Sequence, residues 1–274
     1  TRPTIGAWLN YGLGSENENL PGFVAISHPR SGKLWRSGFL PSKFQGTQFS
    51  PDETVPEKMI PYLKNPIQDK AAQRQQLDLI QQLNRLHLAD RSTDGFLEGR
   101  IQAMETAFRM QFAASEAFDV QGETREIRKL YGENTFGNSC LLARRLVERG
   151  VRYVQVFSGP GQPWDDHHDI NKNLRQRCPG IDRACAGLIT DLKQRGLLDE
   201  TLIVWGGEFG RTPVSEAGTG RDHNPYGFTV WMAGGGIRGG VAHGATDEFG
   251  FRAVENRVNI HDLHATLLHQ MGID

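Results

Sequence analysis

Two short runs of β-branched and aromatic residues, each ending in a polar loop, constrain this chain more than any other feature. The runs are residues 151–157 and 201–205, and the polar loops after them contain carboxylate and imidazole side chains. A buried parallel strand with a functional loop at its carboxyl end has this pattern. We therefore predict an α/β fold with a site at the carboxyl edge of a sheet.

The rest of the chain from residue 137 onward alternates between helical and strand patterns. Apolar spacing predicts helices over 136–150 and 181–192 and from His261 onward, with a further strand over 227–233. A short helix over 5–9 and a strand over 22–26 are predicted near the beginning. Alternating helices and strands are typical of a mainly parallel sheet between helical layers.

Residues 67–130 have a different character, because they are polar, favour helix and contain little Gly or Pro. Two apolar stripes repeat at helical spacing, and they consist of Leu79, Leu83 and Leu86, and of Leu97, Ile101, Met104, Phe108 and Phe112. We predict two amphipathic helices that form an insertion or cap, and we interpret the second stripe, which contains the Met and Phe residues, as core packing.

Length and charge favour one α/β domain spanning residues 1–274 with the helical insertion at 67–130. The formal net charge of −1 gives no reason to expect nucleic acid as a partner. No apolar run approaches the ~18 residues of a membrane-spanning helix. Thr1 is not a start methionine and Asp274 directly follows a helical pattern, so we expect a fragment of a longer protein.

The loop after the first run contains five consecutive ionisable residues, from Asp165 to Asp169. Like charges packed this closely are costly unless a cation neutralises them, which favours a metal site. Ordered strand ends also give side chains fixed directions, so that two or three of them can converge. A solvated charged loop is the alternative.

The loops after the second run add Glu208, Arg211, Asp222 and His223. His223 is a candidate metal ligand with Asp222 as its orienting partner, and the alternative is a turn stabilised by Asn224-Pro225. Arg211 either neutralises Glu208 in a structural pair or binds an anionic substrate by a bidentate contact. Carboxylate and imidazole together are what a divalent ion needs.

Three motifs carry a resemblance to a known family: Trp164-Asp-Asp-His, Gly207-Glu-Phe-Gly-Arg-Thr-Pro213 and Asp222-His-Asn-Pro. They resemble the bacterial DUF1501 family, which is common in planctomycetes, and the likeness extends over nearly the whole chain. That family is grouped with the alkaline phosphatase-like superfamily of phosphatases, sulfatases and phosphoglycerate mutases. The resemblance implies an alkaline phosphatase-like fold.

The resemblance further implies a metal-dependent hydrolase of sulfate or phosphate esters, acting on a small molecule or a glycan. The ligands of the divalent ion (Zn, Ca, Mg or Mn) would be Asp165, His167 or His168, Glu208 and His223, and Arg211 would bind the anionic group. It also implies a periplasmic or secreted location. The pattern does not predict an oligomeric state.

Two departures from the superfamily pattern keep other functions open. Phe209 stands where superfamily enzymes place a second metal-binding side chain, and neither the nucleophile nor a Cys-x-Pro-x-Arg motif is found. The alternatives are a degenerate, non-catalytic member that acts in binding or as a scaffold, and an enzyme that uses metal-bound water without a protein nucleophile.

Overall fold

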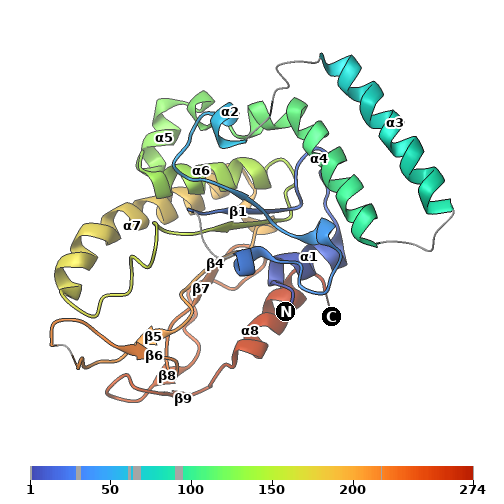
Figure 1. Ribbon diagram of the computed structural model, residues 1–274. Helices are drawn as coiled ribbons and strands as arrows, with labels where there is room; N and C mark the ends of the chain where they lie inside the picture. The colour runs from blue at the N-terminus through green and yellow to red at the C-terminus, as the bar shows by residue number, and fades with distance from the viewer. Residues whose placement is uncertain are drawn as a thin grey trace. The chain divides into compact units, whose positions relative to one another are not determined.

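The computed structural model describes residues 2–28, 32–60, 63, 69–89, 95–216 and 218–273 (Figure 1). The chain forms two compact units. Unit 1 consists of Thr1–Arg128 and Leu141–Phe157, and unit 2 consists of Lys129–Cys140 and Ser158–Asp274.

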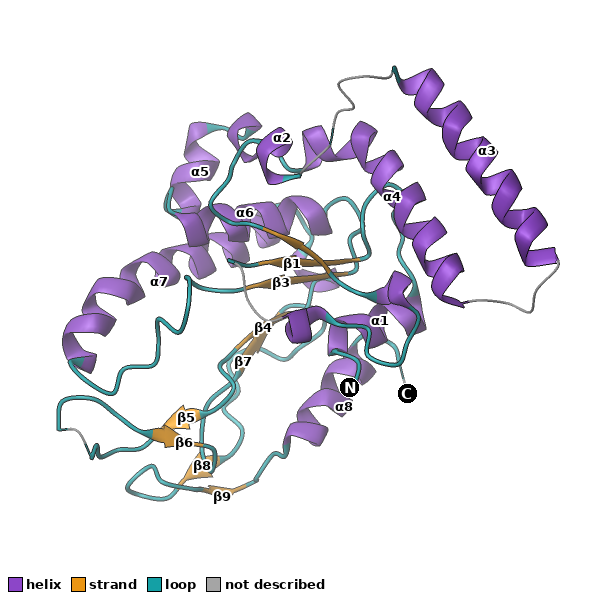
Figure 2. Cartoon of the chain, viewed as in Figure 1, coloured by secondary structure: helices purple, strands orange, loops and turns teal. Residues whose placement is uncertain are grey.

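Helices occur in both units (Figure 2). They are α1 (Ile5–Leu13), α2 (Pro56–Met59), α3 (Lys70–Ala89), α4 (Gly95–Ala117), α5 (Arg125–Tyr131), α6 (Thr135–Val147), α7 (Ile170–Gln194) and α8 (Ile260–Gln270). The strands are short: β1 (Phe23–Ile26), β2 (Thr47–Phe49), β3 (Tyr153–Val156), β4 (Ile203–Trp205), β5 (Gly210–Arg211), β6 (His223–Asn224), β7 (Trp231–Ala233), β8 (Ala245–Thr246) and β9 (Ala253–Glu255). No helix among the described residues is long and apolar enough to cross a membrane.

Unit 1 is built on a three-stranded parallel sheet in the order β2-β1-β3. The central strand β1 is fully buried, because its residues FVAI are apolar on both faces of the sheet. The rings of Phe23 and Tyr153 on neighbouring strands meet edge to face, with centroids 5.0 Å apart. A Cβ atom at Gly6 would overlap the Tyr153 ring, so glycine lets α1 pack directly on this sheet.

The helical insertion of unit 1 contains α3 and α4, which contact each other through polar side chains. Glu105 of α4 accepts hydrogen bonds from Arg74 and Gln81 of α3. In the first stripe Leu79, Leu83 and Leu86 are exposed. The second stripe was interpreted as core packing, which is correct for Phe108 but wrong for Met104, because Met104 is exposed. The side chains of Leu97 and Phe112 lie outside the described residues.

A buried ionic cluster joins α6 to the segment before α5 within unit 1. Arg144 is almost fully buried, and its guanidinium lies 2.8 Å from Glu123 and 2.7 Å from Glu148. Arg145 also pairs with Glu123 and donates to the carbonyl of Ala117. Buried charges persist only when they are paired in this way.

Unit 2 corrects part of the predicted topology. Residues 201–205 and 227–233 were expected to join a mainly parallel sheet, but β4 and β7 pair with each other antiparallel. The residues between β4 and β7 contain the β5–β6 hairpin and no helix among those that the structure describes. A parallel return requires a long crossover, usually a helix, whereas an antiparallel return does not.

Helix α7 of unit 2 is anchored by its buried residue Asp191. The hydroxyl of Tyr131 donates to Asp191 at 2.9 Å in a buried contact, and Arg195 donates to the same carboxylate at 2.8 Å. At the far end of the chain, Asn259 and Asp262 form a capping box on α8. The two side chains thereby satisfy backbone N–H groups at the start of the helix.

Candidate metal-binding site

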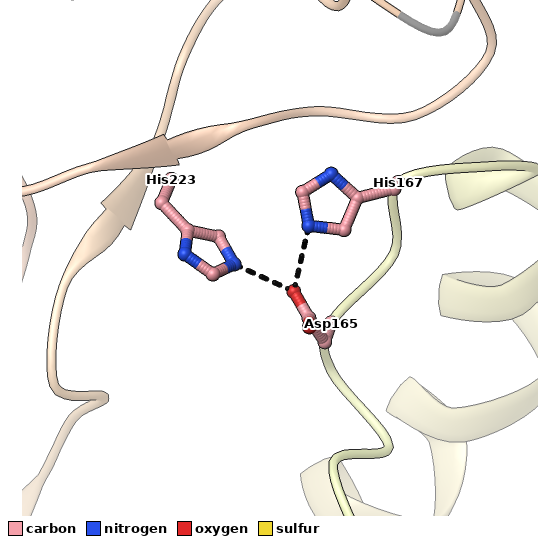
Figure 3. A group of neighbouring side chains, drawn as sticks. All are labelled: Asp165, His167 and His223. Carbon is pink, nitrogen blue, oxygen red and sulfur yellow. Dashed lines mark hydrogen bonds and ion pairs between the residues drawn. The ribbon is translucent and has the colours of Figure 1, made fainter.

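Unit 2 brings together three side chains from two loops that are distant in sequence: Asp165, His167 and His223 (Figure 3). Each offers one ligand atom, and these atoms all lie within 4.8 Å of one another. The centre of the group is Asp165 Oδ1, which lies 2.8 Å from His223 Nε2 and 3.2 Å from His167 Nε2. Figure 3 shows both rings turned toward this oxygen.

The loop of Asp165 is anchored by its buried neighbour, Asp166. The Asp166 carboxylate accepts hydrogen bonds from Arg177 at 2.7 and 2.8 Å and from Asn173 at 2.7 Å, both on α7. Its carbonyl accepts from the backbone N–H of Arg221 at 3.0 Å. Alternation along the loop therefore turns Asp166 inward as a structural residue and leaves Asp165 and His167 to face the site.

The second loop approaches the first closely because it contains a glycine at the point of contact. Gly220 packs against the backbone of Asp166 and His167, and a Cβ atom there would overlap the His167 carbonyl group. The backbone N–H of Asp169 also donates a hydrogen bond to Thr219 Oγ1 at 3.0 Å. Asp169 has a φ of 53° at the start of α7, a left-handed conformation that Asp tolerates better than most residues.

The β5–β6 hairpin delivers His223 and Arg211 to the same side of the site. These two residues are direct partners across the antiparallel pair, so their side chains are neighbours. A Cβ atom at Gly210 would lie 2.8 Å from Cβ of Phe228, so glycine is required for the hairpin to pack here. The hairpin thus explains why both Arg211 and His223 reach Asp165.

Asp165 is held as a carboxylate by its neighbours. Hydrogen bonds from His223 and then from Arg211 lower the pKa of Asp165 to about 2. Arg211 Nη2 lies 2.9 Å from Asp165 Oδ1 and 3.0 Å from the Trp164 carbonyl oxygen. The structure pairs Arg211 with Asp165 rather than with Glu208, and its binding of an anionic substrate stays a prediction.

His167 lies between two carboxylates. Its Nδ1 lies 3.3 Å from Asp222 Oδ1, on the ring edge opposite Asp165. Asp222 was predicted to orient His223, but the structure places it on His167. A hydrogen bond from the backbone N–H of Glu216, and then one from His167, hold the pKa of Asp222 below its usual value. An ionised Asp222 favours a proton on Nδ1 and leaves the Nε2 lone pair for a metal.

The other predicted ligands have different positions. His168 and Glu208 are both exposed and are not part of the three-residue group. Between His167 and His168, which the sequence left open, the structure brings His167 to Asp165. Phe209, which cannot bind a metal, lies with its ring 4.3 Å from that of His223. The sequence shows that Phe209 follows Glu208, but it does not show that Phe209 packs on His223.

Two imidazoles and one carboxylate suit a transition ion or zinc better than calcium or magnesium, which prefer oxygen ligands. The donor set therefore fits a single divalent ion with positions left for water or substrate. Fold and site together define a mixed α/β protein with a two-histidine, one-carboxylate cluster beside an arginine.

The sequence profile of the family described as "Protein of unknown function (DUF1501)" matches residues 1–274. The chain therefore belongs to the DUF1501 family, as its motifs indicated. No curated protein and no solved structure matches this sequence.

Proposed function

We propose that the chain is a divalent-metal-dependent hydrolase of sulfate or phosphate esters. The observation that carries the proposal is the convergence of Asp165, His167 and His223 on one point, with the guanidinium of Arg211 beside them. A cation and a guanidinium in one site match the charge of a tetrahedral oxyanion ester.

Each side chain of the cluster has a definite part in this proposal. Asp165, His167 and His223 would hold the ion, and Arg211 would bind and orient the anionic group of the substrate. Asp222 would keep the proton of His167 on Nδ1, so that Nε2 faces the ion. When bound, the ion would polarise the ester and neutralise the charge that develops on its oxygens.

The family resemblance also leads us to propose an alkaline phosphatase-like fold for the chain. Its parallel β2-β1-β3 sheet and its polar loops after strand ends are consistent with that architecture. The extracytoplasmic location remains a proposal of the same origin.

One observation favours a rival function. Phe209 packs on His223 where the superfamily has a second metal ligand, which favours a non-catalytic member with a binding role. A third candidate is an enzyme that uses metal-bound water without a protein nucleophile, and detection of a covalent intermediate would argue against it.

The deciding experiment measures metal content and ester hydrolysis of the same purified chain. Zinc, manganese, calcium and magnesium are added separately to chelator-treated protein, and aryl sulfate and aryl phosphate turnover is followed. We expect turnover that requires zinc or manganese and is lost in the Asp165→Asn variant. Metal binding without turnover of either ester would instead favour the non-catalytic function.

A further inference from the structure

The Arg211 guanidinium contacts several groups of the chain around the candidate site. Its Nη2 contacts Asp165 Oδ1 at 2.9 Å and the Trp164 carbonyl at 3.0 Å, and its Nη1 contacts the Arg221 carbonyl at 3.4 Å. The guanidinium carbon also lies 5.7 Å from the centre of the Phe209 ring. In this arrangement the one formal negative charge among these contacts comes from Asp165.

The same Asp165 oxygen belongs to the candidate metal site. Asp165 Oδ1 is the atom toward which His167 and His223 turn, so an ion held by the three residues would share it with Arg211. A cation bound to this oxygen repels the guanidinium and neutralises part of the charge that attracts it. Binding of the ion therefore weakens the Arg211–Asp165 pair.

We propose that Arg211 is an oxyanion-binding residue that Asp165 keeps engaged, and that a divalent ion at Asp165 releases it to bind a phosphate or sulfate group. This inference rests on the proposed function and adds an order of binding to it, with the ion before the anionic substrate. The coupling is reciprocal, so a bound oxyanion also raises the affinity of the site for the ion.

The first test measures binding of inorganic phosphate and inorganic sulfate, in separate calorimetric titrations, to chelator-treated chain without metal. Asp165→Asn removes the charge that holds Arg211, so we expect this variant to bind the oxyanion at least about tenfold more tightly than the wild type. The double variant Asp165→Asn/Arg211→Gln should lose that gain. Circular dichroism confirms that each variant is folded.

Glu208→Gln is the matched control, because it removes one negative charge from an exposed side chain that lies just before Arg211 in the sequence. It accounts for the general effect of charge on anion binding. Equal affinities of Asp165→Asn and Glu208→Gln would overturn the proposal, as would a gain that persists in the double variant.

A second measurement tests the proposal without altering Asp165. Zinc is titrated into the chelator-treated wild type and into Arg211→Gln in the absence of any oxyanion. Removal of the competing guanidinium should tighten zinc binding about tenfold. Unchanged or weaker binding in Arg211→Gln would contradict the proposal. Absence of zinc binding in both proteins would defeat the proposed function instead, and the metal-free titrations would still decide the role of Arg211.

Discussion

His223 Nε2 lies 2.8 Å from Asp165 Oδ1, although 58 residues separate the two along the chain. The contact exists because Gly220 lets one loop lie against the backbone of the other, and because the β5–β6 hairpin places His223 beside Arg211. A cluster built from two loops in this way depends on their mutual support.

The first prediction concerns the number of ions and their dependence on pH. We expect one divalent ion per chain, because three ligands converge, and we expect His223→Ala to weaken binding about a hundredfold. Asp165, with a pKa of about 2, stays ionised on mild acidification. The loss of binding on acidification should therefore come from the imidazoles, which bind an ion only when they are neutral. Calorimetric titration of metal from pH 7.5 to 5.5 measures both effects, and two tight sites would contradict the first.

The second prediction separates the two adjacent histidines. His167→Ala should weaken metal binding about as much as His223→Ala, because Nε2 of His167 lies 3.2 Å from Asp165 Oδ1. His168→Ala should change the affinity less than about threefold, because His168 is exposed and outside the cluster. Parallel titrations of the two variants decide between them. A larger loss in His168→Ala would reverse our assignment.

The third prediction concerns the contact between the two loops. Gly220→Ala should lower the free energy of unfolding by about 1–3 kcal/mol, because its methyl group overlaps the His167 carbonyl group and pushes the loops apart. Metal affinity should fall with it. Gly239→Ala is the control, because no atom lies within 4 Å of a Cβ built there. Urea unfolding of both variants would measure the difference, and equal stabilities would refute the close approach.

The fourth prediction concerns the ionic cluster of unit 1. Glu123→Gln should lower the free energy of unfolding by about 3 kcal/mol, because it leaves the buried charge of Arg144 without its partner at 2.8 Å. The comparison is made by urea unfolding near pH 7, and a loss below about 0.5 kcal/mol would contradict it.

The pH dependence of the same variant has a defined sign. Burial raises the pKa of Glu123, but the hydrogen bonds and charges of Arg144 and Arg145 outweigh it and hold the pKa below 4.5. A carboxyl group whose pKa is lowered in the folded state stabilises the fold at pH values above its pKa in the unfolded state. This contribution is lost as the pH falls toward the pKa of the folded state. The stability difference between wild type and Glu123→Gln should therefore be constant above about pH 5 and shrink as pH falls below about 4.5.

Several elements could be predicted because their signals are local. Helix α1 ends at Gly14, which has a φ of 68°, and α8 begins at the Asn259–Asp262 capping box. Strands β1 and β3 lie within the apolar runs that predicted them. Each depends on residues within one or two turns of the chain, so periodicity and caps identify it.

The pairing of strands could not be predicted in the same way. The apolar runs predicted β4 and β7 as strands, but such a run contains no information on the direction of the neighbour. The predicted burial of β4 was wrong, because Val204 and Trp205 are exposed. The antiparallel pairing follows from the path of the chain between them, which is a long-range property. The exposed leucines of α3 illustrate the same limit, because a helical stripe indicates a face but not what covers it.

The sequence by itself determined the α/β class, the DUF1501 family and the two loops that supply the site. Only the tertiary structure decided that His167 joins Asp165, that Asp222 contacts His167 and that Arg211 pairs with Asp165. Motifs identify which residues are available, because they are read along the chain. Which side chain each of these residues contacts depends on the close approach of the two loops at Gly220 and on the β5–β6 hairpin. That geometry arises only when distant segments pack together.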